Sequence, residues 1–165
     1  MKKIRIITLC FIMLFGFASL TYAELPVNRI ALGVQLGATM SQVKNVFGVP
    51  DRTTKEQVKS EAYGDFVETT MIYGNESIVV KFYDDNAWRI ESNSNNGWAT
   101  PDGVTVGMSL QGMYDRLGRE DFKDVAQSGE TLYWYNHDTK SKENRGNLYI
   151  FVKNGRVNRI VIAYQ

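Results

Sequence analysis

The sequence predicts an α+β protein of two tandem repeats, each a short helix, or a helix pair, followed by a three-stranded antiparallel sheet. A short helix with both ends marked occurs twice, and residue 37 of the first copy corresponds to residue 107 of the second, an offset of 70. Each copy is followed by segments rich in β-branched and aromatic residues. A polar, turn-forming stretch over residues 93–103 separates the two copies.

The first 23 residues have the composition of a signal peptide. A basic start precedes an apolar run from Ile6 to Ala18, and small residues follow it. We expect cleavage near Ala23 and export of the chain, to the periplasm or the medium. The run is shorter than the roughly 20 apolar residues of a membrane span, and an uncleaved anchor is the alternative. Cys10, the single cysteine, lies inside the run, so no lipid anchor is expected.

The composition of the remaining chain argues against several function classes. Removal of the signal peptide takes away three of the 19 basic residues and none of the 18 acidic ones, which leaves a net charge of −2. No long run of one sign occurs, which disfavours nucleic acid as a partner. A mature chain without cysteine has no disulfide, thiolate nucleophile or cysteine metal site.

The first repeat is assigned to residues 24–96. Alternating apolar residues predict a short extended segment, and Thr39 then caps a helix over residues 39–47. Gln42 completes a capping box, and Gly48 ends the helix. The polar stretch that follows fits a short helix, a loop or a frayed strand. Three antiparallel strands come next: Phe66–Tyr73, Ser77–Tyr83 and Ala87–Ser92.

The second repeat is assigned to residues 97–165. Its helix spans residues 109–117, and Asn154-Gly155 is a strong signal for a two-residue hairpin turn. The first hairpin of this repeat has a long connection over residues 136–146, whose loop residues 137–145 are charged and are expected to carry no core residue. The three strands of this repeat are Thr131–Tyr135, Leu148–Val152 and Arg156–Tyr164.

The first helix and the residues around it form a motif of Leu32-Gly33 followed by Gly37-x-Thr39-x-x-x-Val43-x-x-x-Phe47-Gly48-x-Pro50. This motif and the three strands after it resemble the repeat of the SmpA/OmlA-type small outer-membrane lipoproteins. Two such units in tandem are similar in architecture to beta-lactamase inhibitory protein. This resemblance implies a secreted or envelope protein that acts by protein–protein contact without catalysis. The chain lacks the lipid-attachment cysteine of the former and the disulfides of the latter, so neither specific role is carried over.

Candidate catalytic groups are few. His137 is the single histidine, and its place in the charged loop favours a solvated residue over a catalytic one. The carboxylate pairs Asp84-Asp85 and Glu120-Asp121 fit solvated turns better than a metal or acid–base site. We therefore expect no enzyme activity, no cofactor and no metal, and a hydrolase that uses His137 is the weakest hypothesis.

Aromatic residues of the strands are the candidate binding site. If Ile78, Val80 and Phe82 face the helix, their neighbours along the strand face away. Tyrosine-rich sheet faces flanked by arginines have the composition of a recognition surface, although the same aromatics could instead pack between the two units. The leading interpretation is a binding module for a protein or peptide, and the alternative is a structural or assembly component of the cell envelope. The predicted contact residues are Tyr73, Tyr83, Tyr133, Tyr135, Tyr149, Phe151, Arg89 and Arg159.

Overall fold

The structure is a computed structural model, and it describes residue 25 and the ranges 29–59, 64–136 and 146–164. The predicted signal peptide, Cys10 and His137 lie outside these residues. Within the described part of the chain, no helix has the length and apolar character needed to cross a membrane.

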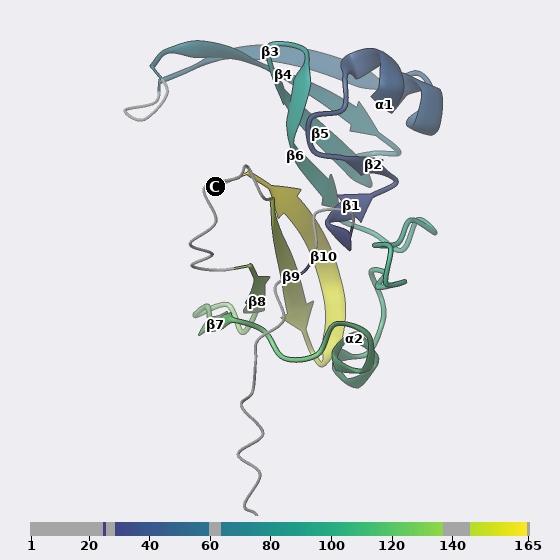
Figure 1. The fold of residues 1–165 in the computed structure, drawn as a ribbon, viewed down its shortest axis with the longest axis vertical. Helices are drawn as coiled ribbons and strands as arrows, with labels where there is room; N and C mark the ends of the chain where they lie inside the picture. The colour runs from purple at the N-terminus through teal and green to yellow at the C-terminus, as the bar shows by residue number, and fades with distance from the viewer. Residues whose placement is uncertain (1–24, 26–28, 60–63, 137–145, 165) are drawn as a thin grey trace, which may run out of the picture.

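The described residues form one large antiparallel sheet, one two-stranded ribbon and two short helices (Figure 1). The helices are α1 (Met40–Phe47) and α2 (Leu110–Leu117), and the ribbon pairs β1 (Ala31–Leu32) with β2 (Val34–Gln35). The large sheet has eight strands in the order β3-β4-β5-β6-β10-β9-β8-β7. These strands are β3 (Arg52–Val58), β4 (Phe66–Tyr73), β5 (Ile78–Tyr83), β6 (Asn86–Ser92), β7 (Phe122–Val125), β8 (Thr131–Tyr135), β9 (Asn147–Lys153) and β10 (Arg156–Ala163).

The predicted fold class is wrong. The chain forms one continuous eight-stranded sheet and is largely β, where the sequence had indicated two tandem units of a helix and three strands. Pairing of β6 with β10 joins the two halves, with Ile90 opposite Ile162 and Ser92 opposite Ile160. The stretch after the first helix, for which a short helix, a loop and a frayed strand were open, forms the strand β3, whereas β7 was not expected. The residues of both strands are nearly all exposed, so they show no alternation. The division of the chain between residues 96 and 97 stays a prediction.

Both predicted helices are confirmed, with their caps. The Thr39 side chain accepts a hydrogen bond from the Gln42 backbone N–H at 3.2 Å, and Gln42 Oε1 accepts one from the Thr39 N–H at 2.8 Å. Ser109 Oγ likewise accepts from the Gly112 N–H at 3.1 Å. Each helix is only eight residues long, so satisfied end groups matter for its stability.

Replacing Thr39 by alanine is expected to lower the free energy of unfolding by about 1 kcal/mol, because the Gln42 N–H loses its acceptor. Urea denaturation followed by circular dichroism measures this change. Ser41→Ala, one residue inside the same helix and also exposed, is the matched control and should leave the midpoint nearly unchanged. Equal midpoint shifts for the two variants would contradict a capping role for Thr39.

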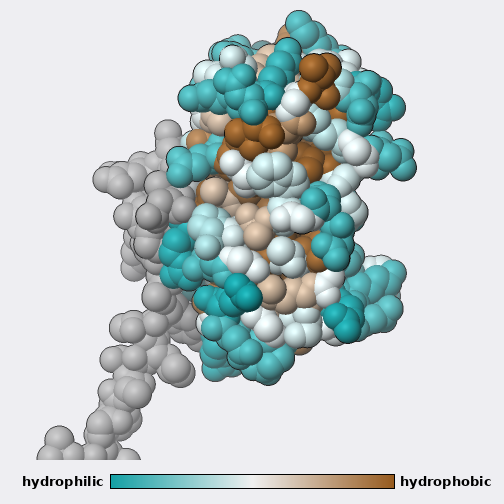
Figure 2. Space-filling model, turned by 90° about the vertical axis from the view of Figure 1, so that its right-hand side faces the viewer, coloured by the Kyte–Doolittle hydropathy of each residue, from teal (hydrophilic) through white to brown (hydrophobic). Residues whose placement is uncertain are grey.

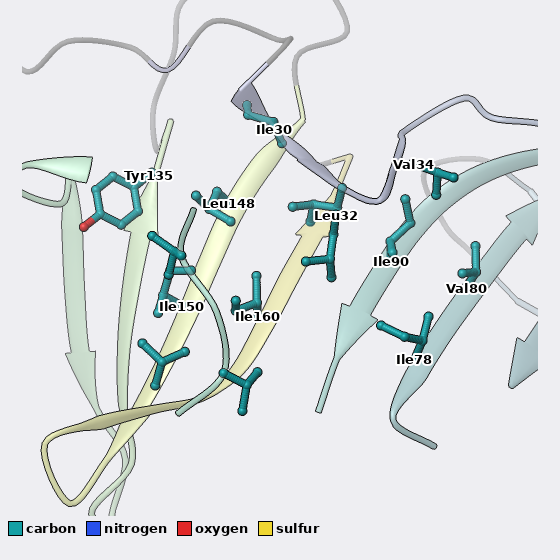
Figure 3. Packing of buried hydrophobic residues seen from close by; sticks show 14 of the residues in the cluster. Ile30, Leu32, Val34, Ile78, Val80, Ile90, Tyr135, Leu148, Ile150 and Ile160 are labelled. Atoms are coloured by element: carbon teal, nitrogen blue, oxygen red, sulfur yellow. The ribbon is translucent and has the colours of Figure 1, made fainter. Parts of the chain in front are cut away.

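Both helices and the β1–β2 ribbon pack on one face of the sheet, which we call the inner face. In Figure 3, Ile30, Leu32 and Val34 follow one another across the sheet, over side chains of both halves. Leu32, Ile90 and Ile160 are fully buried in this one cluster. The segment that precedes α1 therefore covers the junction between β6 and β10, and the two halves of the sheet share a single core.

Each helix lies over its own half of the inner face. Val43 of α1 and Met113 of α2 are both fully buried. The Phe47 ring lies 5.6 Å from that of Tyr73 and 4.8 Å from that of Trp98, measured between centroids. Figure 2 views the molecule from this helix-bearing side, where apolar surface gathers in the upper half and hydrophilic residues cover both ends.

A buried asparagine fastens the start of the described chain to the second half. Asn136 is 1% exposed and has a φ of +66°. Its Oδ1 accepts from the Leu25 N–H at 2.8 Å, and its Nδ2 donates to the Leu25 carbonyl at 3.0 Å and to that of Gly146 at 3.3 Å. Leu25 is 2% exposed and belongs to the core. The loop over residues 137–145, which is expected to carry no core residue, lies outside the described residues.

Candidate functional site

The face of the sheet opposite the helices, which we call the outer face, carries a row of residues that crosses all eight strands. Directly opposed residues in neighbouring strands lie on the same face, so the register defines the row. None of its members belongs to the core cluster beneath the helices. From β3 to β7 the row reads Arg52, Ile72, Val79, Glu91, Val161, Tyr149, Trp134 and Phe122.

The last three members of this row are aromatic, and we call them the aromatic row. The rings of Phe122 and Trp134 meet edge to face, with centroids 6.0 Å apart. The Trp134 and Tyr149 rings are tilted by 39° at 5.1 Å. Trp134 Nε1 donates to Asn147 Oδ1 at 3.2 Å, which fixes the indole on the sheet. Phe122 is 41% exposed, and the other two rings are half-buried. Among the described residues, three contacting rings therefore lie on the face of the sheet opposite the two helices.

Arginines border the aromatic row and are held by carboxylates. The Arg159 guanidinium stacks on the Phe151 ring, 3.7 Å from its centroid, and its Nη2 lies 3.3 Å from Glu130 Oε2. Arg89 Nε lies 2.6 Å from Glu91 Oε1 on the same strand. Burial raises the pKa of the Tyr149 hydroxyl, and the positive charge of Arg89 opposes that rise. The face thus combines planar rings with cations of defined orientation.

The predicted contact residues divide between the two faces. Tyr149, Phe151, Arg89 and Arg159 lie together on the outer face around Val161. Tyr83 also lies on the outer face and is 43% exposed, but it contacts Phe66 at 4.9 Å, and β6 and β10 separate it from the aromatic row.

Three predicted tyrosines are buried on the inner face. Tyr73, Tyr133 and Tyr135 are 7%, 3% and 3% exposed. Tyr133 and Tyr135 would share the outer face only if Leu132 and Trp134 pointed inward, and in β8 the directions are reversed. Both sides of this strand are apolar, so its own alternation does not choose a face. The register of β8 with β9 determines which side chains face inward, because Tyr133 and Tyr135 oppose the buried Ile150 and Leu148.

The inward tyrosines serve packing and hydrogen bonding. The Tyr135 hydroxyl donates to the Gly118 carbonyl at 3.1 Å, and burial is the main cause that raises its pKa. The Tyr133 ring packs edge to face against Tyr114 of α2 at 5.8 Å. Sequence reasoning missed Trp134 and Phe122. The β8–β9 register places Trp134 beside Tyr149, and the β7–β8 register places Phe122 beside Trp134.

A cavity of about 40 Å³ lies between the β1–β2 ribbon and the end of β10, lined by Ile30, Gln35, Leu36, Gly146 and Tyr164. Small-molecule pockets are usually several hundred Å³, so this cavity has room for little more than water. Among the described residues, no group of three His, Cys, Asp or Glu side chains is placed to bind a metal ion.

Comparison with known proteins yields structural likeness only. No protein-family model matches the chain, and no curated protein sequence matches it. An extracellular protein with an SCP domain from Bacillus anthracis is similar at a TM-score of 0.51 and 8% identity, over 88% of this chain and 47% of that one. At this identity the likeness concerns the fold alone.

Two further structures are similar at lower scores. A candidate beta-lactamase inhibitor protein from Streptococcus mutans has a TM-score of 0.33 and 13% identity, over 76% of this chain and 82% of that one. A cysteine-rich secretory protein from Staphylococcus aureus has a TM-score of 0.48 and 8% identity, over 79% of this chain and 43% of that one. This chain therefore spans less than half of the Bacillus and Staphylococcus proteins. None of these likenesses supports the resemblance to the SmpA/OmlA lipoproteins.

Proposed function

We propose that this protein is an exported, non-enzymatic module that binds a protein or peptide partner through the outer face of its sheet. The aromatic row of Phe122, Trp134 and Tyr149 is the centre of the contact, and Phe151 with Arg159 extends it. The observation that carries the proposal is three contacting rings on a sheet face that is outside the core cluster. Exposed aromatic patches on soluble proteins usually mark a binding site.

The side-chain chemistry suits a protein surface better than a charged polymer. Tyrosine, tryptophan and arginine are the residue types that contribute most binding energy at protein interfaces. Arg89 and Arg159 already form ion pairs with Glu91 and Glu130. The surface therefore presents aromatic rings and guanidinium groups of fixed orientation, with little excess charge. A partner with apolar side chains and a few hydrogen-bonding groups would fit this surface.

The experiment is cross-linking in the native host, with the captured protein identified by mass spectrometry. Tyr149→Ser and Phe151→Ser remove half-buried rings of the outer face and should lower the yield of one captured species at least about tenfold, as expected for central interface residues. Val49→Ser removes an apolar side chain that is 88% exposed beyond the end of α1, and it is the matched control.

Thermal unfolding of the same variants separates binding from folding. The proposal requires that capture is lost while the melting temperature stays close to that of the unmodified protein. Loss of the fold in Tyr149→Ser would mean that the aromatic row serves stability, and equal capture by all variants would mean that the partner binds elsewhere.

A further inference from the structure

The outer edge of β3 is a regular strand edge with no neighbour among the described residues. All seven residues of β3, Arg52–Val58, pair with β4 in one unbroken register, and the sheet order begins at β3. Figure 1 places β3 and β4 at the upper rim of the sheet. Six of the seven residues are exposed. Such an edge presents unpaired backbone N–H and C=O groups to any further strand.

Natural edge strands are usually protected by proline, by a bulge or by short length. The sequence Arg-Thr-Thr-Lys-Glu-Gln-Val contains no proline, and its register shows no shift. Among the described residues, the features of this edge that could hinder pairing with a further strand are the charged side chains of Arg52, Lys55 and Glu56. Their order along the strand decides whether they repel a second copy or attract it.

A two-fold axis perpendicular to the sheet would pair two copies of β3 antiparallel, with both inner faces on the same side. Residues that face each other across this axis must then lie on the same face, so one residue of the strand, which we call the centre, opposes its own copy, and the axis runs between the two. With the axis at Thr54, Arg52 opposes Glu56 of the partner subunit, and the same contact occurs a second time by symmetry. Lys55 then opposes the partner's Thr53, a neutral side chain.

The other possible centres are less favourable. An axis at Lys55 or at Glu56 places two like charges directly opposite each other, which destabilises a strand pair. An axis at Thr53 leaves only residues 52–54 of each strand in contact. Thr54 is therefore the centre that combines a five-residue overlap with two attractive charge pairs.

The opposite edge of the sheet, formed by β7, has no register about such an axis in which unlike charges pair. The edge strand β7 has four residues, and an axis at Lys123 or at Asp124 brings two identical charges together. In β3, by contrast, Arg52 is available for a new contact. Its present ion pair with Glu76, at 3.1 Å, joins side chains that are 59% and 65% exposed, and such pairs contribute little.

We propose that two copies of this protein associate through their β3 edges, antiparallel and centred on Thr54, so that one sheet continues through both subunits. This interface is separate from the aromatic row, which lies at the other end of the sheet. Because the axis is perpendicular to the sheet, the dimer presents both aromatic rows on the same side, which would let it bind two sites at once.

Sedimentation velocity of the purified full-length protein over a wide concentration range is the test. The unmodified protein should show a concentration-dependent equilibrium between monomer and dimer. Arg52→Glu and Glu56→Arg should each raise the dissociation constant about tenfold, because two attractive pairs become repulsive. The double variant that carries both changes should return the constant close to its original value.

Lys55→Glu is the matched control, since it changes the charge as much as Arg52→Glu at a position that opposes Thr53. It should leave the dissociation constant nearly unchanged, and circular dichroism should confirm that every variant is folded. A monomer at all concentrations, species larger than the dimer, an equal effect of Lys55→Glu, or failure of the double variant to restore association would each overturn the proposal.

Discussion

Replacing Asn136 by alanine is expected to lower the free energy of unfolding by about 3 kcal/mol, because buried backbone groups lose their partners and the backbone stays left-handed. The Asn136 amide satisfies the N–H and the carbonyl of Leu25 and donates to the carbonyl of Gly146. Alanine makes none of these bonds, and it disfavours a φ of +66°. Urea denaturation measures the loss, and limited proteolysis should show earlier cleavage near Leu25.

Asn154→Ala is the matched control for the backbone part of this effect. Asn154 is an exposed hairpin residue with a φ of +53°, so its replacement should cost only about 1 kcal/mol of conformational strain. The difference between the two variants isolates the buried hydrogen bonds of Asn136. If both variants lose the same stability, the contact with Leu25 contributes nothing to the fold.

Gly33→Ala is expected to destabilise the protein by a similar amount, about 3 kcal/mol, through left-handed strain and overpacking together. Gly33 has a φ of +74° between β1 and β2. A Cβ at this position would lie 2.8 Å from Trp98 Cε3 and 2.9 Å from Phe47 Cζ. Both rings would have to move, and with them the end of α1. Thermal and urea denaturation measure the change.

Gly155→Ala separates the two causes. Gly155 has a φ of +72° in the two-residue hairpin turn, and a Cβ there would have no atom within 4 Å. This variant should therefore lose only about 1 kcal/mol, the strain of the left-handed backbone alone. Near-equal losses for Gly33→Ala and Gly155→Ala would mean that the Trp98 and Phe47 rings move aside freely.

Features decided by neighbouring residues were predictable from the sequence. The cap at Thr39, its capping box with Gln42 and the end at Gly48 are all present, because each depends on residues a few positions apart. The hairpin turn at Asn154-Gly155 is also present. The strand β4 begins and ends where its residue types indicated, because β-branched and aromatic residues suit a half-buried sheet.

Half of the candidate site could not be predicted in the same way. The outward direction of Tyr149 and Phe151 followed from the alternation with Leu148 and Ile150, which leaves one face of β9 apolar. In β8 the alternation is ambiguous, since Tyr133 and Trp134 are both large and aromatic. The side of the sheet on which they lie therefore depends on pairing with β9.

The sequence by itself determined the two short helices, their caps, the main hairpins and the inward residues of the clearly alternating strands. Only the tertiary structure decided that β6 pairs with β10 to make one sheet, that β3 and β7 form its edges, and that Asn136 is buried. The physical reason is the range of the interactions. Caps and turns are formed by neighbours in the chain, whereas strand register and burial depend on residues brought together from distant parts of the sequence.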